Sequence, residues 1–162
     1  MMAGSDVLAP PRKVRAALLL LDESDRVLLV RFRCQRAVSL PEGNVPSGET
    51  AKTVLGQVVD ASMGLVIQPR QTLLQDVVRV PGAAESYEYV LYGGRLDSSR
   101  KLVLDVNILE YLWVDEGELS NHVSPQYRSR IQVALRALKG ETFVCLVDGQ
   151  EEAGSMPEGL VR

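Results

Sequence analysis

Histidine and cysteine are scarce in this sequence, with one histidine and two cysteines among 162 residues. The cysteines, Cys34 and Cys145, lie far apart and show no metal-type spacing. Two cysteines in a domain of this size also do not make a disulfide framework. We therefore expect neither a structural zinc site nor a disulfide scaffold, and we interpret both residues as reduced thiols of a cytoplasmic protein.

Long apolar runs and a strong net charge are also missing. The apolar run Ala16–Leu21 gives way at once to Asp22 and Glu23, and it is shorter than a signal-peptide core. A membrane span would need roughly 20 apolar residues. The formal net charge is only −3, and lysine and arginine are mostly scattered. A protein without a basic field does not attract nucleic acid or an acidic membrane, so we expect neither a nucleic acid polymer nor a membrane as a partner.

The length of the chain predicts one domain with a substantial core. Residues 1–13 are interpreted as a loose leader that is small, proline-containing and without periodicity. Residues 14–139 carry the regular patterns and are predicted to form the domain. Residues 140–162, which are largely polar and glycine-rich, are interpreted as a C-terminal appendage. No internal repeat or linker divides the sequence.

Hydrophobic patterning predicts strands both before and after a helix near the middle of the sequence. The first two predicted strands form a hairpin, and a loop with two glycines and two prolines follows the third. The strands are predicted at 14–21, 26–32, 38–40, 68–80, 85–96, 108–114 and 142–147, and the loop at 41–49. Helices are predicted at Ala51–Met63, between an N-cap at Thr50 and Gly64, and at Pro125–Lys139, with a short turn at 115–119. This order favours an α/β fold in which helices sandwich a mixed β-sheet over a doubly wound parallel sheet.

The segment Leu40–Thr50 resembles the opening of the Nudix box. That pattern is a glycine, five residues, a glutamate, seven residues, and then Arg-Glu-apolar-x-Glu-Glu-x-Gly-apolar. In this chain, Gly43 and Glu49 match its first two positions, and Gly64 and Leu65 match its last two at the right spacing. The stretch Leu109–Leu119 also looks like a strand and turn found late in Nudix domains. The resemblance covers roughly residues 14–139.

The resemblance implies a Nudix-type α/β/α sandwich with a mixed β-sheet. It also implies hydrolysis of a diphosphate linked to a nucleoside or another group, with Mg²⁺ or Mn²⁺ as the cofactor. The family glutamates share one face of a helix because their spacings are one, three and four residues. Such hard cations prefer carboxylate, phosphate and water oxygens, so this face holds metal against the pyrophosphate and orients the attacking water.

The helix of this chain departs from that pattern at every metal-ligand glutamate. Val58, Ala61 and Ser62 stand at the glutamate positions, and Gln57 replaces the family arginine. Each missing carboxylate removes about 4 kcal/mol of attraction per unit charge at 4 Å and an effective dielectric of 20, and about double that against a dication. Asp60 does not substitute, because it lies about 200° round the helix from Val58.

Glu49 is consequently the only retained metal-ligand candidate, and one carboxylate is a poor cradle for a hydrated dication. We therefore assign no cofactor from the sequence, and Mg²⁺ or Mn²⁺ is expected if the family chemistry persists. Glu42 offers a second loop carboxylate and His122 a general base, and together with Glu49 these are the candidate catalytic residues. The alternative interpretation of Glu42 and His122 is that both are ordinary surface residues of loops. The candidate ligand-binding residues are Arg31, Arg33, Gly43 and Arg95, where the arginines could reach a phosphate.

Three functions remain open at this point. The first is a module that binds a nucleotide or another phosphorylated small molecule with little or no diphosphate hydrolysis. The second is an active hydrolase of nucleoside diphosphate derivatives in which Glu42, Glu49 or His122 replaces the usual residues. The third is a protein-interaction module. The sequence leaves the oligomeric state open, and long central strands make a homodimer a reasonable expectation. Fold alone does not choose among these functions.

Overall fold

The computed structural model describes residues 12–151 and contains an eight-stranded mixed sheet with helices on both faces. Its strands are β1 (Lys13–Leu21), β2 (Val27–Phe32), β3 (Glu42–Asn44), β4 (Thr72–Val78), β5 (Ser86–Arg95), β6 (Ile108–Val114), β7 (Val144–Val147) and β8 (Gln150–Glu151). Its helices are α2 (Ala51–Met63), the 3₁₀ helix η1 (Glu116–Asn121) and α3 (Pro125–Gly140). In this part of the chain, no helix is long and apolar enough to cross a membrane.

Strand β1 lies at the centre of the sheet, whose order is β6-β2-β1-β5-β4-β7-β8. It pairs in parallel with β5 along its whole length and antiparallel with β3 over Arg15–Ala17. Alternate β1 side chains enter two different hydrophobic clusters: Ala17, Leu19 and Leu21 on one face, and Ala16, Leu18 and Leu20 on the other. Burial on both faces explains why this strand reads as a continuous apolar run.

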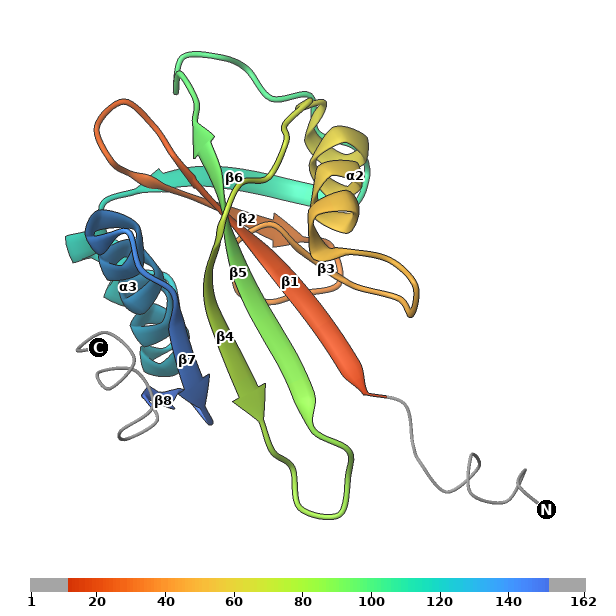
Figure 1. Ribbon diagram of the computed structural model, residues 1–162. Helices are drawn as coiled ribbons and strands as arrows, with labels where there is room; N and C mark the ends of the chain where they lie inside the picture. The colour runs from red at the N-terminus through yellow and green to blue at the C-terminus, as the bar shows by residue number, and fades with distance from the viewer. Residues whose placement is uncertain (1–11, 152–162) are drawn as a thin grey trace.

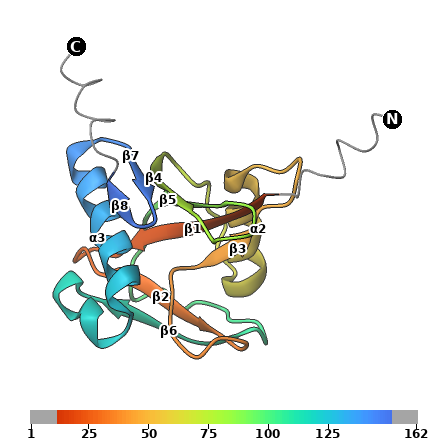
Figure 2. The same ribbon diagram turned by 90° about the horizontal axis from the view of Figure 1, so that it is seen from below.

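The two main helices cover opposite faces of the sheet (Figures 1 and 2). Helix α2 contributes Leu55, Val59 and Met63 to one cluster. Helix α3 contributes residues such as Ile131 and Leu135 to the other. The predicted α/β/α sandwich with a mixed β-sheet is thereby confirmed. Helix α2 begins after its predicted N-cap Thr50, and α3 begins at the predicted Pro125, where Ser124 is the N-cap.

Two local predictions of the sheet were wrong. The expected strand at 38–40 is reduced to one bridge between Ser39 and Val30, while β3 forms inside the expected loop. The reason is that β2 leaves β1 after the turn and pairs with β6, which leaves the first half of β1 with an unpaired backbone edge. That edge is satisfied by β3 and its flanks, where Leu18 N–H donates to Pro41 O and Val45 N–H donates to Val14 O.

Residues 140–151 extend the sheet. Strand β7 pairs in parallel with β4, and β8 pairs antiparallel with β7. The proposed division into leader, domain and appendage stays a prediction. Residues 1–11 of the expected leader and the last eleven residues lie outside the described residues, whereas Lys13, the last residue of that leader, belongs to β1. Cys34 is exposed and Cys145 partly buried, and both are free thiols in the described structure.

A methyl group at Gly93 is expected to destabilise the fold by about 1–3 kcal/mol, because it overpacks a filled core. A Cβ there would lie 2.7 Å from Leu20 Cδ2 and 2.8 Å from Leu18 Cγ, and the latter atom is not a flexible chain end. Urea unfolding of Gly93→Ala measures the loss. Gly117→Ala is the matched control, because a Cβ at Gly117 meets no atom within 4 Å. Equal stabilities of the two variants would contradict the packing argument.

Candidate functional site

The segment Leu40–Thr50, which resembles the opening of the Nudix box, contains β3 and then turns into the start of α2. Gly48 adopts a left-handed conformation with φ of 89°, and Glu49 N–H donates to Pro46 O at 3.0 Å. Thr50 caps the helix by accepting a hydrogen bond from Thr53 N–H at 3.1 Å. The Glu49 side chain is exposed on this turn. The loop therefore has a defined conformation, with one carboxylate facing solvent.

On the face of α2 that would carry the family glutamates, one side chain packs against the loop and another forms a hydrogen bond within the helix. Val58 is half-buried against Gly43, where an added Cβ would lie 3.0 Å from Val58 Cγ2. Ser62 is buried and its hydroxyl donates to Val58 O. Ala61 is exposed and has no polar atom to offer. Methyl groups and a satisfied hydroxyl occupy the positions at which carboxylates would hold a metal.

These residues do not fit the Mg²⁺ or Mn²⁺ that the resemblance implies. Both cations take carboxylate oxygens as their main protein ligands. Among residues 12–151, no three His, Cys, Asp or Glu side chains come together in an arrangement that could hold a metal ion. Glu49 alone cannot supply the charge of the missing set, so no chemical step is assigned to a metal at this site.

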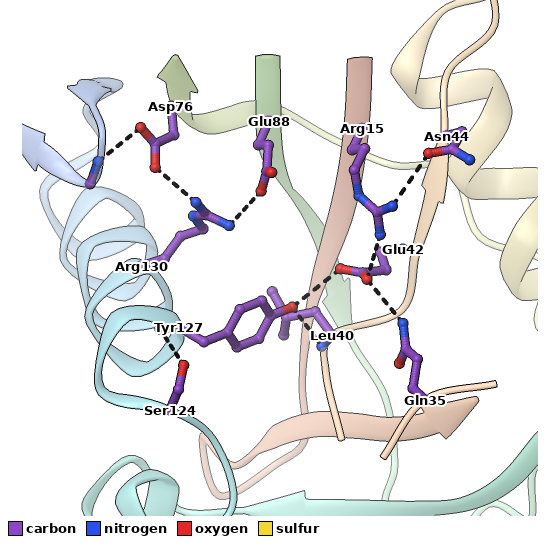
Figure 3. A network of polar contacts seen from close by, with 11 residues as sticks. Arg15, Gln35, Leu40, Glu42, Asn44, Asp76, Glu88, Ser124, Tyr127 and Arg130 are labelled. Carbon is purple, nitrogen blue, oxygen red and sulfur yellow. Dashed lines mark hydrogen bonds and ion pairs between the residues drawn. The ribbon is translucent and has the colours of Figure 1, made fainter. Parts of the chain in front are cut away.

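Glu42 lies at the centre of a polar cluster on the side of β3 that faces away from α2 (Figure 3). Its Oε2 pairs with Arg15 Nη2 at 2.7 Å, and Gln35 Nε2 donates to it at 3.4 Å. The Tyr127 hydroxyl donates to Glu42 Oε1 at 3.5 Å and accepts from Leu40 N–H at 3.0 Å. Because β3 pairs with β1 in register, Arg15 and Glu42 are brought together although 27 residues separate them.

Tyr127 connects this cluster to α3. Burial raises the pKa of its phenol above the usual value, and the negative charge of Glu42 raises it further. The phenol therefore stays protonated at neutral pH and remains a donor to the carboxylate. Helix α3 is thereby held against the segment that leads into the box.

A second cluster surrounds Arg130, one turn further along α3. Arg130 Nη2 pairs with Asp76 Oδ2 at 2.8 Å, and Nη1 pairs with Glu88. Asp76 is 0% exposed and also accepts from Gly149 N–H at 3.0 Å. Burial alone would lower the pKa of Arg130, but the hydrogen bond to Asp76 and the charge of Glu88 raise it above its usual value. The cluster connects β4, β5, α3 and the β7–β8 turn.

Little space remains between the two clusters. The cavity that Arg15, Glu42, Glu88, Tyr127 and Arg130 help to line has a volume of about 10 Å³, which is about the room that one water molecule needs. Both arginines are already paired with carboxylates there. This part of the site is therefore occupied by the protein's own ion pairs.

A larger hollow opens on the outer side of Tyr127. It has a volume of about 450 Å³. Its walls are the segment 35–39, the two residues before α3, Val123 and Ser124, and Tyr127 in the first turn of α3. Arg36 is the charged residue of the wall, and no carboxylate lines it. No carboxylate among residues 12–151 forms an ion pair with Arg36. We refer to this hollow as the Arg36 groove.

Sequence reasoning did not single out Arg36, and the arginines that it did name have partners within the protein. Arg31 pairs with Glu110 at 2.7 Å, and Arg33 Nε donates to Val106 O at 2.7 Å. The only signal for Arg36 was its place in the short connection 33–37, and such a signal does not distinguish a free from a paired side chain.

The remaining predicted residues do not converge. Arg95 pairs with Asp25 at the Leu21 end of β1, whereas Glu42 lies beside Ala17. His122 is exposed at the end of η1, where its N–H donates to Leu119 O. Gly43 supports Val58, as described above. Of the predicted residues, Glu42 alone joins the cavity wall beside the Arg36 groove.

Comparison with known proteins places the fold. No family model and no curated protein matches the sequence. Among solved structures, the MutT protein from Methanosarcina mazei Go1 is 21% identical with a TM-score of 0.63, over 81% of this chain and 96% of that one. The NUDIX domain of Shewanella oneidensis NrtR, complexed with ADP ribose, is 12% identical with a TM-score of 0.65, over 82% and 92%. A Nudix hydrolase from M. smegmatis, RenU, is 21% identical with a TM-score of 0.63, over 80% and 87%.

Proposed function

We propose that this chain, which has the Nudix fold, binds a nucleotide or another phosphorylated small molecule and carries out little or no metal-dependent diphosphate hydrolysis. The observation that carries the proposal is the packing of Val58 against Gly43 on a helix face without carboxylates. A hydrolase of this fold uses those carboxylates to hold the metal that neutralises charge and activates water. A binding protein needs neither of these functions.

The Arg36 groove is the site at which we place the ligand. A guanidinium recognises phosphate with paired hydrogen bonds, and Arg36 meets no competing carboxylate in the wall. The positive end of the α3 dipole lies at Ser124 and adds to the attraction for an anion. Val38 and Val123 provide apolar contact for the uncharged part of the ligand. Phosphate and a less polar group would thus be held side by side.

The solved neighbours support the ligand class. The NrtR domain is complexed with ADP ribose, and other structures of the same fold include a UDP-X diphosphatase with a TM-score of 0.67 at 13% identity. For those proteins the ligand is a nucleotide derivative. We extend this class to the present chain because its groove places a cationic group beside an apolar wall.

Arg36→Gln is expected to weaken binding at least about tenfold, because a hydrogen bond to a charged group contributes roughly 1.5–3 kcal/mol. Calorimetry with ADP-ribose, ADP and AMP, without divalent metal, measures the dissociation constants. Arg100→Gln serves as the matched control, since it removes the same charge from an exposed arginine outside this groove. The far-UV spectrum of each variant reports its folding.

Two results would overturn the proposal. One is the absence of binding for all three probes. The other is release of AMP or phosphate from ADP-ribose with Mg²⁺ or Mn²⁺, at a rate abolished by Glu49→Gln. The second result would instead establish the altered hydrolase, since Glu49 is the one carboxylate retained at the metal-ligand positions.

A further inference from the structure

Arg70 is held in a defined place by groups that leave its charge unneutralised. Its backbone N–H donates to Tyr92 O at 2.7 Å, and its guanidinium lies 5.7 Å from the centre of the Tyr92 ring. A Cβ on Gly94 would lie only 3.3 Å from Arg70 Nη2. The guanidinium thus rests between an aromatic ring and a bare stretch of backbone, and such a planar group loses little entropy when it binds an anion.

No carboxylate within the described residues forms an ion pair with Arg70. Seven other arginines of this part of the chain do have carboxylate partners, at positions 15, 26, 31, 79, 95, 130 and 136. An arginine that is positioned by a ring and a glycine, but not neutralised, is available to a ligand.

The surroundings of Arg70 form a groove of about 450 Å³ between the segment 66–70 and the end of β5 at 93–96. Two arginines and a glutamine line it, and none of its lining residues carries a carboxylate. Backbone N–H groups of Val66, Ile67 and Gln68 are not used in the backbone hydrogen bonds of the described chain. These amides have no backbone acceptor among the described residues and are available to donate to a ligand.

Arg95 is the second arginine that lines the groove, but its guanidinium already has partners within the protein. It pairs with Asp25 and donates to Asp22 O at 2.8 Å. These contacts fix Arg95 at the edge of the groove and neutralise much of its charge. Arg70 is therefore the residue on which attraction for an anion depends.

We propose that this groove is a separate binding site for a phosphate-sized oxyanion, free or as the phosphate group of a small molecule. Arg70 would supply the charge and the paired donors. Gly94 would allow close approach, because it carries no side chain on the side that faces the Arg70 guanidinium. The site lies outside the Arg36 groove and shares no lining residue with it. It therefore does not rest on the proposed function.

A titration of the ¹⁵N-labelled full chain with inorganic phosphate tests the site, at an ionic strength held constant with sodium chloride. We expect saturable amide shifts confined to residues 66–70 and 93–96. Arg70→Gln should weaken the dissociation constant at least about tenfold, in line with the loss of a charge-assisted contact. Arg100→Gln is the control, since Arg100 is exposed and lines neither groove. Arg70→Lys keeps the charge without the fork and should bind between the two.

A second arm compares inorganic phosphate with AMP. Equal affinities would assign the site to a free oxyanion, and tighter binding of AMP would assign it to a phosphorylated small molecule; both results support the site. Shifts that do not saturate, or that survive Arg70→Gln unchanged, would overturn it. Shifts confined to residues 35–39 and 123–127 would also overturn it, while supporting the Arg36 groove as the phosphate site.

Discussion

Replacing Arg130 with methionine is expected to lower the free energy of unfolding by about 3–5 kcal/mol. The reason is that Asp76 has no exposed surface and would lose its cationic partner, and only the Gly149 N–H would remain as a hydrogen-bond donor to it. An uncompensated charge in the interior costs more than the lost pair itself contributed. Urea unfolding followed by the fluorescence of Trp113, the one tryptophan, measures the change.

The matched control is Arg136→Met on the same helix. Arg136 pairs with Glu151 at 3.5 Å, and both side chains are at least half exposed. Such surface pairs contribute about 0–1 kcal/mol, so this variant should be nearly neutral. The double variant Asp76→Asn, Arg130→Met should recover part of the loss, because it removes the stranded charge. Equal effects of the two single variants would contradict the role assigned to Arg130.

Local signals in the sequence were sufficient for the main elements. The apolar run that ends at Leu21 predicted a buried strand, and the two clusters show that this strand is buried on both faces. Thr50 and Gly64 predicted the ends of α2 because each acts through its own backbone neighbours. Thr50 accepts from Thr53 N–H, and Gly64 adopts φ of 66° while its N–H donates to Asp60 O.

The polar clusters could not be predicted, because their members are distant in the sequence. Arg130 meets Asp76 across 54 residues and Glu88 across 42, and no periodicity connects such pairs. The same holds for the arginines proposed as ligand contacts. Arg31 is paired through the register of β2 with β6, where it lies directly opposite Glu110. A single sequence shows which side chains carry charge, but only tertiary structure shows which charges are already neutralised.

This internal pairing bears on the proposed function. Two arginines, Arg15 and Arg130, and two carboxylates, Glu42 and Glu88, line the small cavity, and each arginine is paired with one of these carboxylates. A phosphate entering that space would have to displace carboxylates in a region with room for about one water molecule. The Arg36 groove presents no such competition, because no carboxylate lines it. Electrostatics therefore favours a ligand on the outer side of Tyr127.

The second large effect is expected from restoring the family glutamates. The triple variant Val58→Glu, Ala61→Glu, Ser62→Glu should bind Mn²⁺ at least about 100-fold more tightly than the parent chain, which is about 2.7 kcal/mol. This is a small part of the coulombic attraction of three carboxylates for a dication, because water competes for the metal. Calorimetry measures the affinity, and the melting temperature should rise with added Mn²⁺, since a ligand of the native state stabilises it.

The control variant is Lys52→Glu, Gln57→Glu, at two exposed positions of the same helix. The first change alters the charge by two and the second by one, which matches the three negative charges added in the triple variant. It should bind Mn²⁺ no better than about the parent level, because positions 52 and 57 lie about 140° apart round the helix and cannot bring their carboxylates to one metal ion. Equal gains in the two variants would show that charge alone attracts the metal. Micromolar Mn²⁺ binding by the parent chain would contradict the interpretation of Val58, since a methyl packed on the loop cannot be a ligand.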